Sequence, residues 1–135
     1  MIFADVLVDV LVVEDDPDLS DVMLLALHEA GYAARCAGNG REALEAAAKQ
    51  LPGLVLLDVL MPVMDGWQCA RELRARYGRT LPIVVVTAAE HVRARSHELG
   101  ADDVLSKPFD IDDFLRTVAR YYGAPQPATP SIAGP

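Results

Sequence analysis

The chain has 135 residues, of which 52% are hydrophobic, and these figures are those of one domain with a sizeable apolar core. Its 20 acidic and 12 basic residues give a net charge of −8, which argues against nucleic-acid binding. No apolar run approaches the roughly 20 residues that a membrane-spanning helix needs, and the start of the chain lacks the positive charge of a signal peptide. We therefore expect a cytoplasmic protein with no nucleic-acid and no membrane partner.

Cysteine and histidine can bind transition metals, and cysteine can act as a nucleophile. In this chain neither type shows a spacing that indicates such a role. Cys36 and Cys69 fit neither a zinc-ligand spacing nor a disulfide framework, which favours a reducing compartment and a packing role. His28, His91 and His97 fall on predicted helices without a metal-ligand spacing, so we expect them at the surface.

Short apolar runs alternate with helical patterns along the chain. Pro17 marks the start of the first helix, Gly31 its end because glycine is favoured just after a helix, and Asn39 the N-cap of the next. In chain order the sequence predicts a strand at 6–13, a helix at 17–30, a strand at 32–36, a helix at 40–50, a strand at 54–57, a helix at 67–77, a strand at 82–86, a helix at 90–99, a strand at 103–106 and a helix at 111–122.

This alternation predicts an α/β protein with a doubly wound parallel sheet, because buried parallel strands are typically continuous apolar runs. Residues 1–122 would form the domain. Residues 123–135 contain four prolines and small residues that cannot build a core element, which indicates a disordered tail or linker.

Polar residues stand where the apolar runs stop. Glu14 and Asp15 follow the first run, Asp58 the third, Thr87 the fourth and Lys107 the fifth. In an open α/β sheet ligands bind beyond the carboxyl ends of the strands, so we expect these side chains to converge on one crevice. Such a set suits a cation together with a phosphate, and without metal the close carboxylates should raise one another's pKa.

Three neighbouring acidic features have a plainer interpretation. Asp16 precedes Pro17 and is expected to cap the first helix. Asp65-Gly66 is typical of a turn rather than of site chemistry. Asp102-Asp103 are expected to be surface or helix-flanking charges.

Four stretches of sequence carry a resemblance to a known family, and together, in this order, they are highly specific. The chain resembles the receiver domain of a two-component response regulator over about residues 5–122. The resemblance implies a flavodoxin-like sheet with strand order 2-1-3-4-5. The matching stretches are Val-Val-Glu-Asp-Asp-Pro at 12–17, Asn-Gly-Arg-Glu-Ala-Leu at 39–44, Leu-Asp-Val-Leu-Met-Pro-Val-Met-Asp-Gly at 57–66 and Gly-Ala-Asp-Asp-Val-Leu-Ser-Lys-Pro-Phe at 100–109.

The resemblance also assigns a chemistry to the crevice. Asp58 would accept a phosphoryl group as an aspartyl phosphate, so the protein would catalyse only its own phosphorylation and dephosphorylation. Mg²⁺ would be bound directly by Asp15 and Asp58, largely through water by Glu14, and by the backbone carbonyl of Leu60. The phosphodonor would be a sensor histidine kinase or a histidine phosphotransfer protein.

The remaining residues of the resemblance concern the phosphoryl oxygens and the output. Lys107 would supply the counter-charge, aimed by a cis peptide bond to Pro108, and Thr87 would bond a phosphoryl oxygen. Movement of Thr87 would signal to a downstream protein or domain through the face of the fourth helix, the fifth strand and the fifth helix. Val104 stands where the family usually has an aromatic residue, so that relay must differ here, and Thr117 replaces a basic residue expected for a dimer across this face.

Two other classes of function would need residues that this chain lacks. A phosphatase of the haloacid dehalogenase type would need a second acid where Leu60 stands, and a dinucleotide- or flavin-binding module would need a glycine-rich loop where residues 14–17 are acidic. The alternative that remains open is a receiver-like scaffold that binds partners without phosphorylation.

Overall fold

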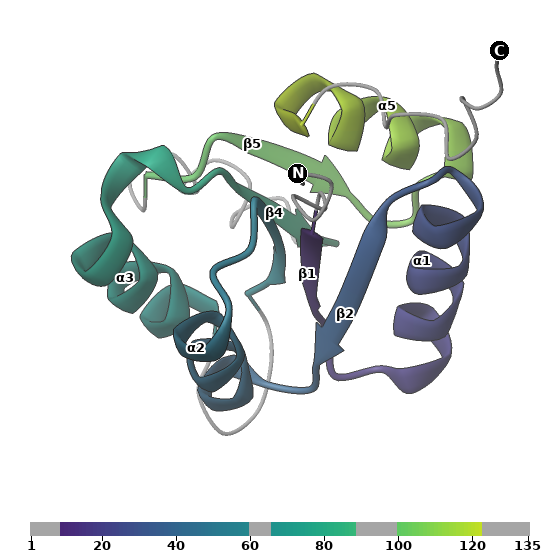
Figure 1. Ribbon diagram of the computed structural model, residues 1–135. Coiled ribbons are helices and arrows are strands. Elements are labelled where there is room, and N and C mark those ends of the chain that lie inside the picture. Colours follow the sequence, from purple (N-terminus) through teal and green to yellow (C-terminus); the bar gives the residue numbers. More distant parts are fainter. Residues whose placement is uncertain (1–8, 60–65, 89–99, 123–135) are drawn as a thin grey trace, which may run out of the picture.

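A five-stranded parallel sheet runs through the middle of the molecule (Figure 1), and its strand order β2-β1-β3-β4-β5 confirms the predicted fold class. The computed structural model describes residues 9–59, 66–88 and 100–122 of the chain. The strands are β1 (Asp9–Val13), β2 (Ala33–Ala37), β3 (Leu54–Asp58), β4 (Ile83–Thr87) and β5 (Asp103–Ser106).

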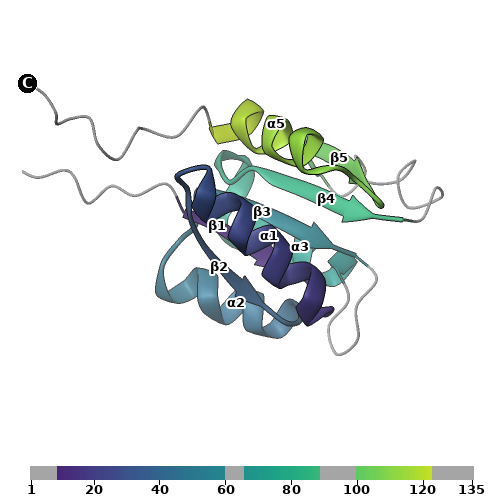
Figure 2. The same cartoon turned by 90° about the vertical axis from the view of Figure 1, so that its right-hand side faces the viewer.

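Helices cover both faces of the sheet (Figures 1 and 2). On one face lie α1 (Pro17–Glu29) and α5 (Ile111–Tyr122), and on the other α2 (Gly40–Lys49) and α3 (Gly66–Tyr77), followed by a 3₁₀ turn at Gly78–Thr80. No helix in these three ranges is long and apolar enough to span a membrane. The predicted helix at 90–99 lies outside the described residues.

The central strands serve two cores at once because successive side chains of a strand point to opposite faces. Val10 and Val12 of β1 pack on the side of α1 and α5, whereas Leu11 and Val13 pack on the side of α2 and α3. All four are at most 1% exposed. This double burial explains why the strand reads as an unbroken apolar run.

The ends of α1 and α2 follow the predicted capping residues. The Asp16 carboxylate accepts hydrogen bonds from two backbone N–H groups in the first turn of α1. The Asn39 side chain accepts a hydrogen bond from one backbone N–H of α2. At the other end of α1, Gly31 has a φ of 100°, and the N–H of Tyr32 donates to the carbonyl of Leu27 at 2.9 Å. This is the Schellman arrangement, in which a left-handed residue lets the chain turn back on the helix.

The second and fourth strands each lie one residue later than the sequence predicts, the fourth at 83–87 instead of 82–86. The strand predicted at 32–36 lies at 33–37, because the N–H of Tyr32 closes the end of α1 and pairing with β1 begins at Ala33 opposite Asp9. Tyr32 nevertheless remains buried. Residues 6–8, predicted to begin the first strand, lie outside the described residues.

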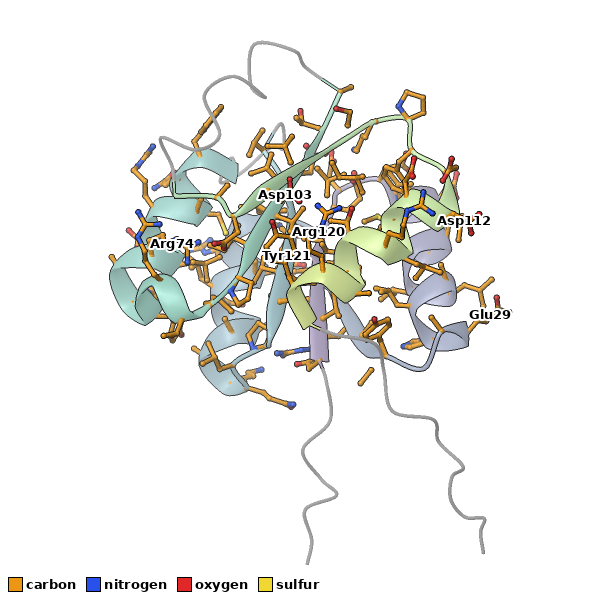
Figure 3. All side chains as sticks on the ribbon, turned by 90° about the horizontal axis from the view of Figure 1, so that it is seen from above. Glu29, Arg74, Asp103, Asp112, Arg120 and Tyr121 are labelled. Carbon is orange, nitrogen blue, oxygen red and sulfur yellow. The ribbon has the colours of Figure 1, made fainter. Side chains whose placement is uncertain are left out.

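Helix α5 is attached to the sheet by an aromatic pair and an ion pair. Phe114 is fully buried, and its ring stacks on that of Phe109 at a centroid distance of 5.4 Å. Arg120 reaches Asp103 of β5 at 2.6 Å, and both residues are labelled in Figure 3. Since Phe109 lies in the segment that joins β5 to α5, the stacking also fixes this connection.

We predict that Phe114→Ala lowers the free energy of unfolding by about 3–5 kcal/mol, the usual cost of emptying a buried aromatic site. Urea unfolding followed by circular dichroism measures the change. Arg116→Ala on the exposed side of the same helix is the control and should change it by only about 0.5 kcal/mol. Equal losses in the two variants would contradict the described packing of α5.

Candidate functional site

The predicted polar residues gather at the carboxyl edge of the sheet. Glu14 directly follows β1, Asp58 is the last residue of β3, Thr87 is the last residue of β4, and Lys107 directly follows β5. Strands β1 and β3 are neighbours, as are β3 and β4. The parallel sheet therefore brings residues that are up to 93 positions apart in the chain into one place.

Lys107 links the two buried acids of this edge. Its Nζ donates to Oε1 of Glu14 at 2.9 Å and to Oδ2 of Asp58 at 3.1 Å. Glu14 and Asp58 are only 4% and 6% exposed. A buried carboxylate is costly unless it is paired and hydrogen-bonded, so the ammonium group compensates both.

A third carboxylate completes a candidate metal site. One carboxylate oxygen from each of Glu14, Asp15 and Asp58 lies within 4.8 Å of the others, and Asp15 is exposed to solvent. Ligand oxygens on opposite sides of an octahedral Mg²⁺ are about 4.2 Å apart. The cluster therefore has the donor chemistry and nearly the spacing for a small divalent cation that keeps several of its waters.

The charges of the site perturb one another. Burial raises the pKa of Glu14, and the nearby Asp58 charge adds to this, while the bonds from Lys107 and the Asp16 N–H act against it. Burial would lower the pKa of Lys107, but the bonds to Glu14 and Asp58 outweigh it and leave that pKa above its ordinary value. The expected rise in a carboxylate pKa is thus present at Glu14, although desolvation is its main cause.

Backbone bonds hold Thr87 and Lys107 in register. The N–H of Lys107 donates to the carbonyl of Thr87 at 2.9 Å, directly beyond the pairing of Thr87 with Ser106. Thr87 is buried, and the peptide bond between Lys107 and Pro108 is cis. One backbone hydrogen bond at the end of the β4–β5 pairing therefore connects Thr87, which carries the hydroxyl, to Lys107, which carries the ammonium group.

Two further residues that the sequence assigns to the site are Val104 and Leu60, and the structure describes only the first. Val104 is partly buried and packs against Val59 and Val85, beside the end of β3. Leu60, whose carbonyl was assigned to the metal, lies outside the described residues.

Sequence reasoning missed two backbone contacts at the site. The N–H of Asp16 donates to Oε2 of Glu14 at 3.2 Å, so the residue that caps α1 also orients an acid. The N–H of Gly66 donates to the carbonyl of Val59 at 3.1 Å, immediately after Asp58. The only signal in the sequence was the glycine itself, which was interpreted as part of a turn.

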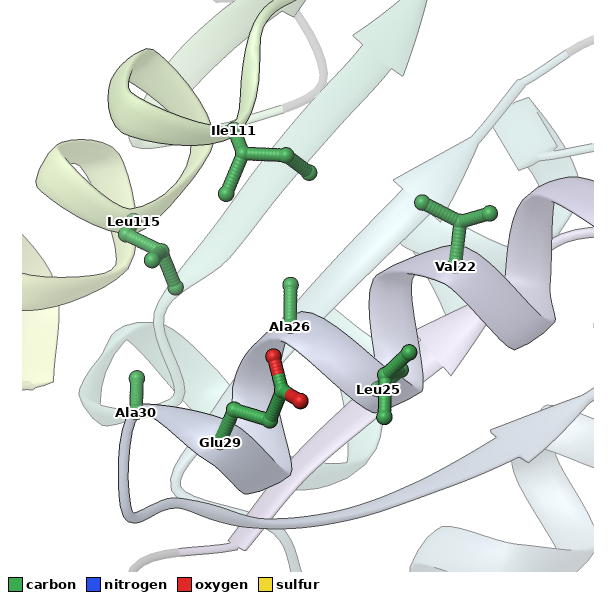
Figure 4. Close-up of a pocket in the computed structure, with 7 residues that line it drawn as sticks. All are labelled: Val22, Leu25, Ala26, Glu29, Ala30, Ile111 and Leu115. Atoms are coloured by element: carbon green, nitrogen blue, oxygen red, sulfur yellow. The ribbon is translucent and has the colours of Figure 1, made fainter.

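An apolar hollow lies between α1 and α5 on the flank of the molecule (Figure 4). Val22, Leu25 and Ile111 border it and are 50%, 59% and 40% exposed. A second hollow shares Val22 and Ile111 with the first and extends to Lys107. This apolar flank was not predicted from the sequence.

The order of the sheet, the acidic cluster and the lysine at the carboxyl edge define a receiver-type α/β domain. Comparison with known families agrees: the model of the response regulator receiver domain matches residues 10–119. The chain belongs to this family.

Individual relatives are consistent with the family. The transcriptional regulatory protein PcoR of Escherichia coli is 40% identical over 111 residues, which are 81% of this chain and 49% of PcoR. The chemotaxis protein CheY4 of Vibrio cholerae has a TM-score of 0.80 at 30% identity, over 85% of this chain and 98% of that one. The response regulator TrrA of Thermotoga maritima, solved in complex with Mg²⁺-BeF, has a TM-score of 0.77 at 32% identity, over 84% and 97%. The chain spans about half the length of the curated relatives it matches.

We predict that Lys107→Met lowers the free energy of unfolding at pH 7 without metal by about 1–3 kcal/mol, because two nearly buried carboxylates lose the ammonium group that contacts both. The loss should shrink as the pH falls toward 4.5, since the raised pKa of Glu14 lets that group take up a proton more readily, and a neutral acid needs no counter-charge. The sign follows from linkage: a folded state that binds the proton more tightly than the unfolded chain loses stability as pH rises.

Urea unfolding at the two pH values, with a chelator present, tests this prediction. Lys49→Met, on the exposed side of α2, is the matched control and should change little at either pH. A Lys107→Met protein as stable as the wild type at pH 7 would show that the ammonium does not compensate the two acids.

Proposed function

We propose that this chain is the phosphoacceptor of a two-component signalling pathway, with Asp58 as the residue that is phosphorylated. The observation that carries the proposal is the contact of Lys107 with both Glu14 and Asp58 at the carboxyl edge of the sheet. Asp58 is central among these groups, since β3 lies between β1 and β4. The donor is a sensor histidine kinase or a histidine phosphotransfer protein.

In this reaction an oxygen of the Asp58 carboxylate attacks the phosphorus atom. The new oxygen–phosphorus bond forms as the bond to the donor's histidine nitrogen breaks, and that nitrogen keeps the electron pair. Catalysis of such a transfer rests on positioning and on neutralising negative charge. Lys107 supplies a positive charge, and Thr87 supplies a hydroxyl for a phosphoryl oxygen.

Mg²⁺ would neutralise the charge of the incoming phosphoryl group and of the carboxylates around it. Asp15 and Asp58 are the direct protein ligands in this proposal, Glu14 acts largely through water, and Leu60 contributes its carbonyl. Three carboxylates within 4.8 Å support this assignment, and a similar receiver, TrrA, is solved in complex with Mg²⁺-BeF.

The output would pass from Thr87 to a downstream protein or domain through the face formed by the helix predicted at 90–99, β5 and α5. Val104 pairs with Val85 and contacts Val59, so it links the neighbourhood of Asp58 to β5 without an aromatic ring. Two arginines of this surface have partners within the chain: Arg120 pairs with Asp103 of β5, and Arg116 pairs with Asp113 of α5. These pairs leave fewer charges for a partner molecule.

We predict that acetyl phosphate and Mg²⁺ add a single phosphoryl group to the wild-type protein, and that Asp58→Asn abolishes this because an amide is a far poorer nucleophile than a carboxylate. Intact-mass spectrometry measures the modification. Asp16→Asn, which keeps the capping oxygen of α1, is the control and should still be modified. Full modification of Asp58→Asn would remove Asp58 from its role, and an unmodified wild type would favour a scaffold that works without phosphorylation.

We predict that Asp15→Asn weakens Mg²⁺ binding at least about 10-fold, because a charged ligand is lost, whereas Asp16→Asn changes it little. Both variants remove one negative charge near the site, so the comparison separates direct ligation from general electrostatics. Isothermal titration calorimetry with MgCl₂ measures both affinities. Equal losses would show that the two acids act only through their charge.

A further inference from the structure

Gly66, the first residue of α3, lies directly against the backbone that follows Asp58. A methyl group on Gly66 would lie 2.2 Å from Cα of Val59 and 2.5 Å from the carbonyl oxygen of Asp58. Both distances are far shorter than any ordinary carbon contact. The first residue of α3 therefore needs to have no side chain for the helix to approach the end of β3 this closely.

Backbone conformation does not explain this glycine. The described glycines with a positive φ are Gly31, Gly78 and Gly100, and Gly66 is not among them. Any residue could adopt the backbone angles of Gly66, so the turn interpretation of Asp65-Gly66 does not account for it. What requires glycine here is space.

The backbone of Asp58 and Val59, which Gly66 contacts, is held firmly in place. Val59 is fully buried, and its carbonyl accepts the Gly66 N–H. Asp58 itself is paired with Val86 in the β3–β4 ladder. Because the peptide bond between Asp58 and Val59 is planar, a displacement of Val59 is passed on to Asp58 and changes the direction of its carboxylate.

We propose that Gly66 is a positioning residue for phosphoryl transfer. By seating α3 on the Asp58–Val59 peptide, it holds the Asp58 carboxylate in contact with Lys107 and close to Glu14 and Asp15. Pairing with Val86 of β4 fixes the backbone of Asp58, and the close approach of Gly66 fixes the peptide that follows it. This inference rests on the proposed phosphoacceptor function of Asp58. In it, Gly66 sets the position of the reacting carboxylate although it has no side chain of its own.

The test compares Gly66→Ala with Leu73→Ala, a fully buried position seven residues further along the same helix. Both substitutions are expected to destabilise the fold, so stability alone does not distinguish them. For each folded variant, calorimetry gives the Mg²⁺ affinity, and intact mass gives the initial rate of phosphorylation by acetyl phosphate at saturating Mg²⁺. If Gly66→Ala is unfolded in buffer, all proteins are measured in trimethylamine N-oxide, which favours the folded state.

Gly66→Ala should be phosphorylated about 10- to 100-fold more slowly at saturating Mg²⁺, the cost of a small misplacement of a reacting group, and should bind Mg²⁺ more weakly. Leu73→Ala should match the wild type in both measurements. Equal behaviour of the two variants, a wild-type rate for Gly66→Ala, or its failure to fold even with the osmolyte would overturn the proposal. If the wild type itself is not modified, or Asp58→Asn is, the proposed function fails instead.

Discussion

The carboxylates of Glu14 and Asp58 are both nearly buried at neighbouring strand ends, and each would raise the cost of ionising the other. The ammonium group of Lys107 compensates both, at 2.9 Å from Glu14 and 3.1 Å from Asp58. Lys107 directly follows β5, which is the outermost strand on its side of the sheet. The site therefore depends on the strand order, because only β4 separates β5 from β3, which leaves the end of β5 within reach of the ends of β1 and β3. A ligand that brings its own charges changes this balance directly.

The apolar strands give that balance its fixed geometry. The apolar side chains of β1 and β3 are at most 1% exposed and are packed by helices on both faces. Close packing of this kind leaves the strand ends little room to move. Asp58 and Thr87 are the last residues of their strands. The strand pairing that holds the core together therefore also fixes the backbone of these two site residues. Polar groups at strand ends thus gain a rigid support without being part of the core.

Local chemistry made much of this predictable. Asp16, Gly31 and Asn39 have roles that follow from caps and from left-handed backbone, and the acids at strand ends follow from the parallel sheet. The shift of β2 by one residue was not predictable from hydrophobicity, because Tyr32 is buried although it lies just outside the strand. The fit of Gly66 against Val59 was not predictable either, since it depends on where a helix meets a strand. Neither spacing nor composition records that distance.

The two edges of the sheet are held in different ways, and the difference suits a site at only one of them. At the amino edge, Arg35 bonds Asp9 at 2.9 Å and the carbonyl of Ala46 at 3.0 Å. Arg74 pairs there with Asp102 at 2.9 Å and bonds several carbonyls as well. A guanidinium group has five donors in a rigid plane, so each arginine fixes several segments at once. At the carboxyl edge the partner is a lysine, a point charge on a flexible stem, whose contacts can be remade without disturbing the fold.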